Sequence, residues 1–201
     1  MKAKRAGIVL FVVGILAFCA AGGLWLCNER EEQTVFEYSE QMTQAFIVQM
    51  ADTTSVTADE DTPDDMKYII LDDGEAYIGL LSIPALNINL PVNNTWSYEK
   101  LRNTPCRFSG DIETDSIVIA AHNYASHFRD IANLAPGELV ILTDAEGNEN
   151  HYSVAEIIIA QPADTNQVVN SDYDLTLFTC TYSGQARVVV RCLRMEKENI
   201  S

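Results

Sequence analysis

The chain has 201 residues, 47% of them hydrophobic, and its 13 Lys and Arg against 29 Asp and Glu give a formal net charge of -16 at pH 7. A surface this acidic repels a phosphate backbone, so the composition argues against nucleic acid as a partner. The length fits one folded domain with accessory segments better than two full domains.

An uncharged apolar run extends from Ala6 to Cys27. At about 1.5 Å of rise per residue, a helix of this length crosses the roughly 30 Å hydrocarbon layer of a membrane. Basic residues precede the run (Lys2, Lys4 and Arg5), and every acidic residue follows Asn28. The positive-inside rule therefore predicts a single-pass protein of the cell membrane with a cytoplasmic N-terminus. Residues 1–28 would form a cytoplasmic tip and a transmembrane signal-anchor that contacts lipid, and the rest of the chain would lie outside the cell.

A cleaved signal peptide is the alternative, because small residues that could flank a cleavage site occur at Ala20, Ala21 and Gly22. The apolar run is longer than the core of a usual signal peptide. This length favours an uncleaved signal-anchor.

Residues 29–65 form two segments of different composition. Apolar residues at steps of three and four, including Val35, Met42 and Phe46, predict a helix from Glu29 to about Met50. The following stretch, 51–65, collects acidic residues, threonines and a proline, which is the composition of a solvated linker. We predict a helical stalk and an acidic linker, and the sequence leaves open whether the helix packs against the next domain.

The segment 66–196 has short β-prone stretches separated by turn signals, a pattern typical of a sandwich or barrel. The predicted strands are 67–71, 76–83, 87–92, 116–121, 138–143, 151–161, 176–180 and the run that starts at Arg187. One helical turn is predicted at 96–102, with Trp96 and Leu101 as core anchors, and a short helix at 128–134. A longer polar loop follows at 162–174, and residues 197–201 form a tail.

A thiol ends one of the last two strands, and an arginine begins the other. The strand Thr176–Cys180 is followed by a turn through Ser183-Gly184, then by Arg187 and a valine run. A positively charged neighbour stabilises a thiolate, the nucleophilic form of cysteine. Taken alone, the pair is better explained as a buried cysteine and a surface arginine.

His122 is the histidine best placed to act with this thiol, because it ends the strongly apolar stretch 116–121. A histidine near a strand-end cysteine can act as general acid or base. His127 starts the predicted short helix, where capping or surface exposure explains it. His151 lies in an alternating strand and is expected to face solvent.

The motif Thr176-Leu177-Phe178-Thr179-Cys180 resembles the Thr-Leu-x-Thr-Cys signature of sortases, membrane-anchored cysteine transpeptidases of Gram-positive bacteria. Other stretches resemble the family in the same order, over about Tyr77 to Met195. They are Leu81-Ser82-Ile83-Pro84, Leu90-Pro91-Val92, the strand into His122 with Asn123, His127-Phe128, Leu134 and Gly137, and Arg187 before the valines. Ala121 departs from the family pattern, which usually has glycine before the histidine.

The resemblance implies a mainly β fold, an eight-stranded β-barrel with short helices. It implies that Cys180 attacks a threonine carbonyl in an LPxTG-like sorting signal and forms a thioacyl-enzyme. His122 would protonate the leaving amine and deprotonate the incoming one, and Arg187 would hold substrate or stabilise the oxyanion. The implied partners are surface proteins with that C-terminal signal and an amine acceptor of the cell-wall precursor.

Neighbours of these residues are weaker candidates for substrate binding. Thr179 and Thr181 flank the nucleophile, although ordinary strand threonines look the same, and Asn123 is a candidate for orienting His122. Arg191 competes with Arg187, because residues four apart on a strand share a face. The Arg-Val-Val-Val context favours Arg187.

The remaining cysteines are expected to be structural. Cys192 points away from both arginines and is predicted to lie in the core, and a Cys106–Cys192 disulfide stays open. Asp111, Glu113 and Asp115 fit an acidic surface turn better than a calcium site, so no metal or other cofactor is expected.

Three functional alternatives remain open at the sequence level. The same Cys180 and His122 fit a membrane-anchored cysteine hydrolase with water as the acceptor. A non-catalytic barrel with an inactive scaffold is a further class. Pilin-polymerising sortases often carry an Asp-Pro-aromatic lid; the segment 29–66 has Thr62-Pro63-Asp64 instead, which favours cell-wall anchoring.

Overall fold

The computed structural model describes residues 2–51, 56–57, 66–161, 163–164, 168–169, 172–181 and 183–196. Most of the predicted acidic linker, part of the polar loop 162–174 and the tail 197–201 lie outside the described residues. The chain divides into two compact units, Met1–Thr34 and Val35–Ser201.

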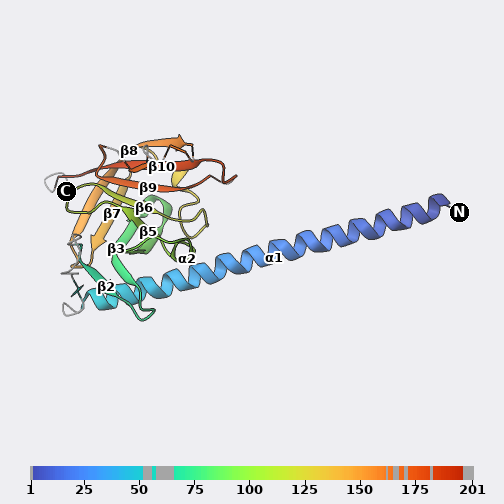
Figure 1. Ribbon diagram of the computed structural model, residues 1–201, viewed down its shortest axis with the longest axis horizontal. Helices are drawn as coiled ribbons and strands as arrows, with labels where there is room; N and C mark the ends of the chain where they lie inside the picture. Colours follow the sequence, from blue (N-terminus) through green and yellow to red (C-terminus); the bar gives the residue numbers. More distant parts are fainter. Residues whose placement is uncertain are drawn as a thin grey trace. The chain divides into compact units, whose positions relative to one another are not determined.

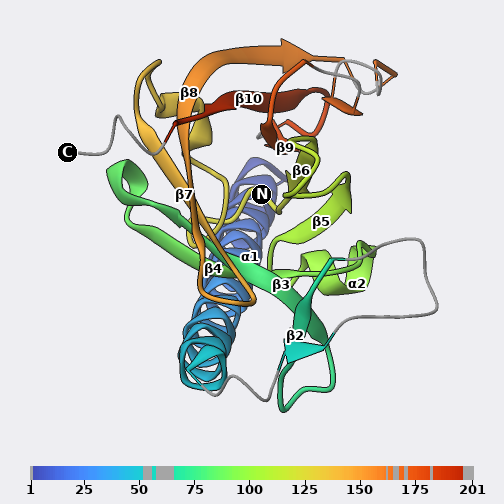
Figure 2. The ribbon, with the colours of Figure 1, turned by 90° about the vertical axis from the view of Figure 1, so that its left-hand side faces the viewer.

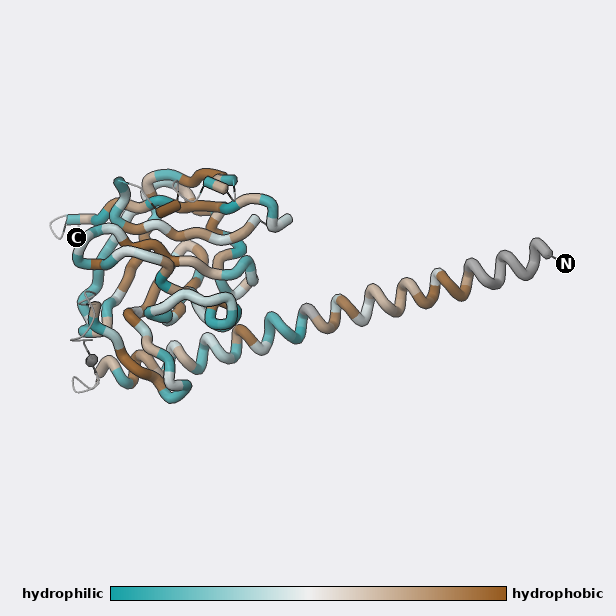
Figure 3. Tube along the Cα trace, viewed as in Figure 1, coloured by the Kyte–Doolittle hydropathy of each residue, from teal (hydrophilic) through white to brown (hydrophobic). Residues whose placement is uncertain are grey.

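The first unit consists of the N-terminal part of α1 (Lys2–Met50) (Figure 1). Large apolar side chains there are well exposed, including Phe11 (70%), Phe18 (82%) and Leu24 (73%). In Figure 3 the apolar colours of this part give way to teal where the acidic residues begin. Within the described residues, α1 is the one helix long and apolar enough to cross a membrane, judged by length and composition. It is therefore a candidate membrane anchor.

The second unit contains a closed eight-stranded β-barrel, which confirms the predicted fold class (Figure 2). The strands run in the order β3-β4-β5-β6-β9-β10-β8-β7, and pairing of β7 with β3 closes the ring. The pairs β4–β5 and β6–β9 are parallel, and the other barrel pairs are antiparallel. The barrel strands are β3 (Ala76–Ile83), β4 (Ile88–Asn93), β5 (Cys106–Ser109), β6 (Ile117–Ala120), β7 (Leu139–Asp144), β8 (Glu149–Ala160), β9 (Leu175–Cys180) and β10 (Arg187–Arg194). The short strands β1 (Val56–Thr57) and β2 (Tyr68–Ile70) extend the sheet beyond β3.

Short helical turns connect some of these strands. They are α2 (Tyr98–Leu101) and the 3-10 turns η2 (Pro84–Leu86) and η3 (Ile131–Asn133). The helix predicted over 128–134 is therefore a single 3-10 turn. Leu101 is buried as predicted, but Trp96 is 37% exposed, so its prediction as a core anchor was wrong.

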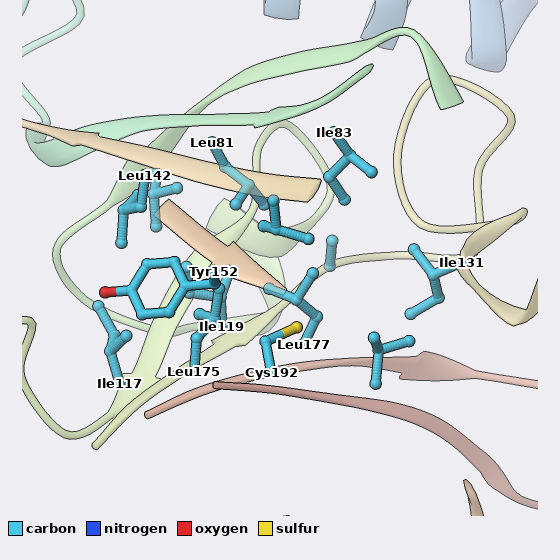
Figure 4. Close-up of a cluster of buried hydrophobic side chains, with 14 of the residues drawn as sticks. Leu81, Ile83, Ile117, Ile119, Ile131, Leu142, Tyr152, Leu175, Leu177 and Cys192 are labelled. Atoms are coloured by element: carbon cyan, nitrogen blue, oxygen red, sulfur yellow. The ribbon is translucent and has the colours of Figure 1, made fainter. Parts of the chain in front are cut away.

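Alternation along the strands separates two apolar layers. Leu175, Leu177 and Cys192 point into the barrel core (Figure 4), whereas Phe178 joins a cluster on the outer face. This confirms the prediction that Cys192 is a core residue. Cys106 packs in another cluster, and both thiols are free, so the structure contains no Cys106–Cys192 disulfide.

The last turns of α1, from Val35 to Met50, pack against the barrel within the same unit. Met42 and Phe46 are buried with Ile69, Leu71 and Tyr77. Two buried hydroxyls on this segment, Ser39 and Thr43, donate to the carbonyls of Asn103 (3.0 Å) and Asn89 (3.2 Å). The segment is thus part of the folded unit, a question that the sequence left open.

Candidate active site

Three neighbouring strands, β6, β9 and β10, bring His122, Cys180 and Arg187 together. Arg187 is the register partner of Cys180 in the antiparallel β9–β10 pair. In the parallel β6–β9 pair, Ala120 is the partner of Phe178, so two further residues along each strand lead to His122 and Cys180. Because neighbouring strands lie about 4.8 Å apart, Cys180 is flanked by the histidine on one side and the arginine on the other.

The three residues belong to the outer face of the barrel. Side chains alternate between faces along a strand, and Ala120, Phe178 and Val189 all lie in the outer clusters. Cys180, two residues after Phe178, and Arg187, two before Val189, therefore share that face. A cavity of about 300 Å³ opens there and is lined by His122, Cys180 and Arg187.

Aromatic side chains form one wall of this cavity. Their rings meet edge to face in a row: Trp96 with Tyr98 (4.9 Å between centroids), Trp96 with Phe108 (5.6 Å), and Phe108 with Phe178 (5.2 Å). Such contacts stabilise aromatic pairs and limit ring motion. The cavity thus offers an apolar wall beside a thiol, an imidazole and a guanidinium.

The two competing arginines have different surroundings. Arg191 donates from Nη1 to Glu156 Oε1 at 2.7 Å and lies 5.3 Å from the ring centre of Tyr173. This hydrogen bond lowers the pKa of the Glu156 carboxyl. Among the described residues, the hydrogen bond of the Arg187 guanidinium is to the carbonyl of Ala186 (3.2 Å), and no acidic side chain forms an ion pair with it. Arg187 therefore keeps a positive charge at the cavity that Arg191 does not supply.

The prediction of capping or surface exposure for His127 was wrong, because its side chain is completely buried. Burial and, to a smaller degree, the neighbouring His122 lower the pKa of His127 to about 4. The ring of Tyr124 lies 5.0 Å from that of His122 and 5.6 Å from that of His127. His151 is only partly exposed (14% of its side chain) and contacts Glu149 at 2.8 Å, so it does not simply face solvent.

The weaker candidates serve different local purposes. Thr179 is buried, and its hydroxyl donates to the carbonyl of Ala121 (2.8 Å), which joins the end of β9 to the residue before His122. The Thr181 hydroxyl lies within hydrogen-bonding distance of Ser183 and Ala186 in the β9–β10 turn. The side-chain oxygen of Asn123 is buried and has no hydrogen-bond partner among the described residues.

The acidic turn before β6 is held by hydrogen bonds within the protein. Asp111 accepts from the backbone of Glu113 (2.7 Å), and Asp115 forms an ion pair with Arg194. Within the described part of the chain, no group of three or more His, Cys, Asp or Glu side chains is arranged to hold a metal ion.

Sequence reasoning missed the aromatic wall and the buried position of His127. Phe178 was quoted only as the variable position of the cysteine motif, and Phe108 was not considered. The alternation along β9, which places Phe178 on the same face as Cys180, is a signal that identifies Phe178. No local pattern marks Phe108 or His127, because their positions depend on contacts with distant segments.

Comparisons with known proteins identify the family. A family model described as "Sortase domain" matches residues 81–195, more than half of the chain. A sortase D5 transpeptidase of Clostridium perfringens is 18% identical over 83% of this chain and 99% of that one, with a TM-score of 0.53. Sortase C of C. perfringens SM101 is 23% identical (83% and 90% covered, TM-score 0.52), and sortase C1 of Streptococcus suis is 24% identical (61% and 76%, 0.52). No match was found among curated proteins. The structural likenesses show a shared fold, and the family match shows that the chain belongs to the sortase family.

Proposed function

We propose that the protein is a membrane-anchored cysteine transpeptidase that cleaves an LPxTG-like sorting signal and joins the released acyl group to an amine of the cell-wall precursor. One observation carries the proposal. The register of β6, β9 and β10 flanks the thiol of Cys180 with an imidazole and a guanidinium at an open cavity. Acyl transfer through a thioester needs a nucleophile, a proton carrier and a group that stabilises negative charge.

Each of the three residues has one proposed task. The sulfur of Cys180 attacks the threonine carbonyl, and Arg187 stabilises the negative charge on its oxygen. Protonated His122 donates to the leaving amine as the peptide bond breaks, which gives the thioester. His122 then removes a proton from the incoming amine, whose nitrogen replaces the sulfur and regenerates the thiolate.

The aromatic wall provides apolar surface for the part of the signal before the scissile bond. Phe108 and Phe178 line the cavity with Cys180, and apolar walls with a few polar groups are typical of peptide-sized sites. We assign the Leu-Pro portion of the signal to this wall. Thr179 supports the site indirectly, through its hydrogen bond to Ala121, whereas Thr181 and Asn123 are left as candidates for contact with the peptide.

The location of the reaction follows from the anchor. With the apolar helix in the membrane and the basic residues in the cytoplasm, the barrel acts outside the cell, where surface proteins and cell-wall precursors meet. Lipid is then a partner of the first unit only.

The decisive test measures products by mass spectrometry. The full chain in detergent is incubated with a peptide that contains a Leu-Pro-x-Thr-Gly sequence, with or without an amine acceptor. Two acceptors, an oligoglycine peptide and a lysine-containing peptide, separate cell-wall anchoring from pilin-type joining. We expect cleavage after threonine, an amine-linked product and a thioester adduct on Cys180.

Controls come from the cysteines themselves. Cys180→Ala should abolish both adduct and product, whereas Cys192→Ala, which removes a buried core thiol on β10, should keep the chemistry in the folded fraction. If only hydrolysis occurs whichever amine is supplied, the transpeptidase proposal fails and a hydrolase remains. Full activity of Cys180→Ala would exclude covalent catalysis by this thiol.

A further inference from the structure

The loop that carries His122 is attached to the helical segment Val35–Met50 through His127. The ring nitrogen Nε2 of His127 lies 3.3 Å from the hydroxyl of Ser39, a contact that joins residues 88 positions apart. Both side chains are buried, with 0% and 1% exposure. A hydrogen bond between two buried polar groups is costly to break, because both lose their partner away from water.

The direction of this hydrogen bond follows from the other contact of the serine. Ser39 has one hydroxyl hydrogen, which it donates to the carbonyl of Asn103 at 3.0 Å. Its oxygen can therefore only accept from His127, so Nε2 carries the ring hydrogen. Burial lowers the pKa of His127 to about 4, and the ring is neutral at neutral pH with this one N–H as its donor.

A short path of contacts leads from His127 to His122. The backbone N–H of His127 donates to the carbonyl of Tyr124 (3.0 Å), and that of Phe128 donates to the carbonyl of His122 (3.1 Å). The ring of Tyr124 lies between the two histidine rings. A shift of His127 therefore displaces both the backbone and the ring surroundings of His122.

Two other polar side chains of the loop, Asn123 and Ser126, do not form such an attachment through their oxygens. Asn123 Oδ1, Ser126 Oγ and His127 Nδ1 are buried and have no hydrogen-bond partner within the described part of the chain. Of these three side chains, the one that bonds to a segment outside the loop is His127, through its other nitrogen. The hydrogen bond from His127 thus links the loop to the helical segment.

We propose that His127 and Ser39 are positioning residues, whose hydrogen bond holds the His122 loop in place. The inference rests on the proposed role of His122 in the transpeptidase. It adds a second histidine and a serine far away in the sequence to the residues on which the geometry of His122 depends. Neither residue touches the peptide in this proposal; both act through the geometry of His122.

Four variants of the full chain test the proposal. His127→Phe removes the donor and keeps a ring, His127→Gln keeps an N–H at similar reach, and Ser39→Ala removes the acceptor. Thr43→Ala is the matched control, since Thr43 is also buried on this segment and donates to a carbonyl, but on β4 rather than on the loop. We expect kcat to fall roughly 10- to 100-fold for His127→Phe with little change in KM, because small misplacement of a catalytic group costs that much. Ser39→Ala should show a smaller loss, His127→Gln a partial rescue, and Thr43→Ala a kcat within about two-fold of the parent.

A second measurement does not require turnover. The imidazole NMR signals of His122, assigned with His122→Gln, should shift in His127→Phe and Ser39→Ala and stay in place in Thr43→Ala. If Thr43→Ala and His127→Phe lose stability equally while kcat and the His122 signals stay unchanged, His127 is merely structural and the proposal fails. If His127→Phe does not fold, the kcat and the His122 NMR signals of Ser39→Ala test the proposal instead. Failure of the parent chain to process any peptide would instead count against the proposed function, and the NMR comparison would still judge the positioning.

Discussion

The two ends of β10 carry arginines in opposite situations. At one end, Arg187 faces the cavity beside Cys180 and donates to the neighbouring carbonyl of Ala186. At the other end, Arg194 donates to the carbonyl of Ile112 (2.6 Å), to Asn150 and to the Tyr152 hydroxyl (3.1 Å), and it forms an ion pair with Asp115. The first guanidinium has its charge available for a ligand, and the second is occupied by the protein.

This difference shows how one residue type serves two purposes on one strand. A guanidinium has five donors in a fixed plane. Where the fold satisfies them, as at Arg194, they tie the loop before β6 to β8 and β10 and stabilise the barrel. At Arg187, where the described residues supply only the carbonyl of Ala186 as a partner, the donors are available for the oxyanion role that we propose. Each of the following predictions tests whether a residue contributes to stability or to activity.

Loss of Arg187 should have the largest effect on catalysis. Arg187→Ala is expected to lower kcat/KM about 100- to 1000-fold, the usual result of removing an oxyanion donor, with little change in the denaturant midpoint. Steady-state assays with the sorting peptide and amine measure the first quantity, and urea unfolding the second. Near-normal transpeptidation by Arg187→Ala together with loss in Arg191→Ala would reverse the assignment.

The buried His127 near the cavity should make folding stability depend on pH. Its pKa is lowered from 6.5 to about 4 by burial and by His122, so between these values the unfolded chain binds more protons than the folded one. The contribution of His127 to the free energy of unfolding is therefore complete above pH 6.5. It declines as the pH falls towards 4, by up to about 3 kcal/mol. Urea unfolding at pH 7, 5.5 and 4.5 measures it. The carboxylates contribute equally to the unfolding free energy of the parent and of His127→Gln, so the difference between the two proteins at each pH is due to this histidine. Equal pH dependence of the two proteins would contradict the prediction.

Loss of Arg194 should affect stability and not chemistry. Arg194→Met keeps the aliphatic length and leaves partners on two segments, the loop before β6 and β8, unsatisfied, which is expected to cost about 2 kcal/mol. Thermal or urea unfolding checks the loss, and the rate per folded molecule should match the parent. A large fall in kcat with unchanged stability would show that the two ends of β10 are not independent.

The smallest effect is expected for Arg191, midway along the same strand. Its partner Glu156 is partly exposed to solvent (side-chain exposure 41%, against 16% for Arg191), and ion pairs at the surface contribute about 0.2–1 kcal/mol. Arg191→Gln should therefore change both unfolding and turnover little. Unfolding curves at low and high salt provide the check. Only the parent should lose a small amount of unfolding free energy at high salt, because salt screens the ion pair.

Much of the barrel was predictable because its signals are local. Alternating β-branched residues and glycine turns identified every barrel strand except β5 (Cys106–Ser109), which was missed. The Thr176–Cys180 motif with His122 and Arg187 identified the candidate site. The closing pair β3–β7 and the parallel pair β6–β9 were not readable from the residues, since they join segments far apart in the sequence. The resemblance to sortases supplied the eight-stranded barrel but not these strand pairs.

The errors have the same origin. Trp96 and His127 lie in irregular segments, where no periodicity indicates which side chains are covered. Trp96 contacts Tyr98 and Phe108 edge to face at the cavity and stays partly exposed, whereas His127 is buried and contacts Ser39 of the helical segment. The apolar face of 35–50 was visible in the sequence, but an amphipathic pattern does not name the surface that it covers.

The pairing of Cys180 with Arg187 also has a consequence for protein engineering. The backbone ladder of β9 and β10 sets the separation of the two side chains, and the turn beyond them is closed by its own hydrogen bond from Thr181 to Ala186 (2.9 Å). Gly184, exposed at the tip, has a φ of +70°, a conformation suited to glycine. A short peptide inserted between Ser183 and Gly184 should therefore leave the nucleophile and its arginine in register. We expect this tip to tolerate grafted sequences that alter substrate choice, and turnover of the sorting peptide by such grafts would measure that tolerance.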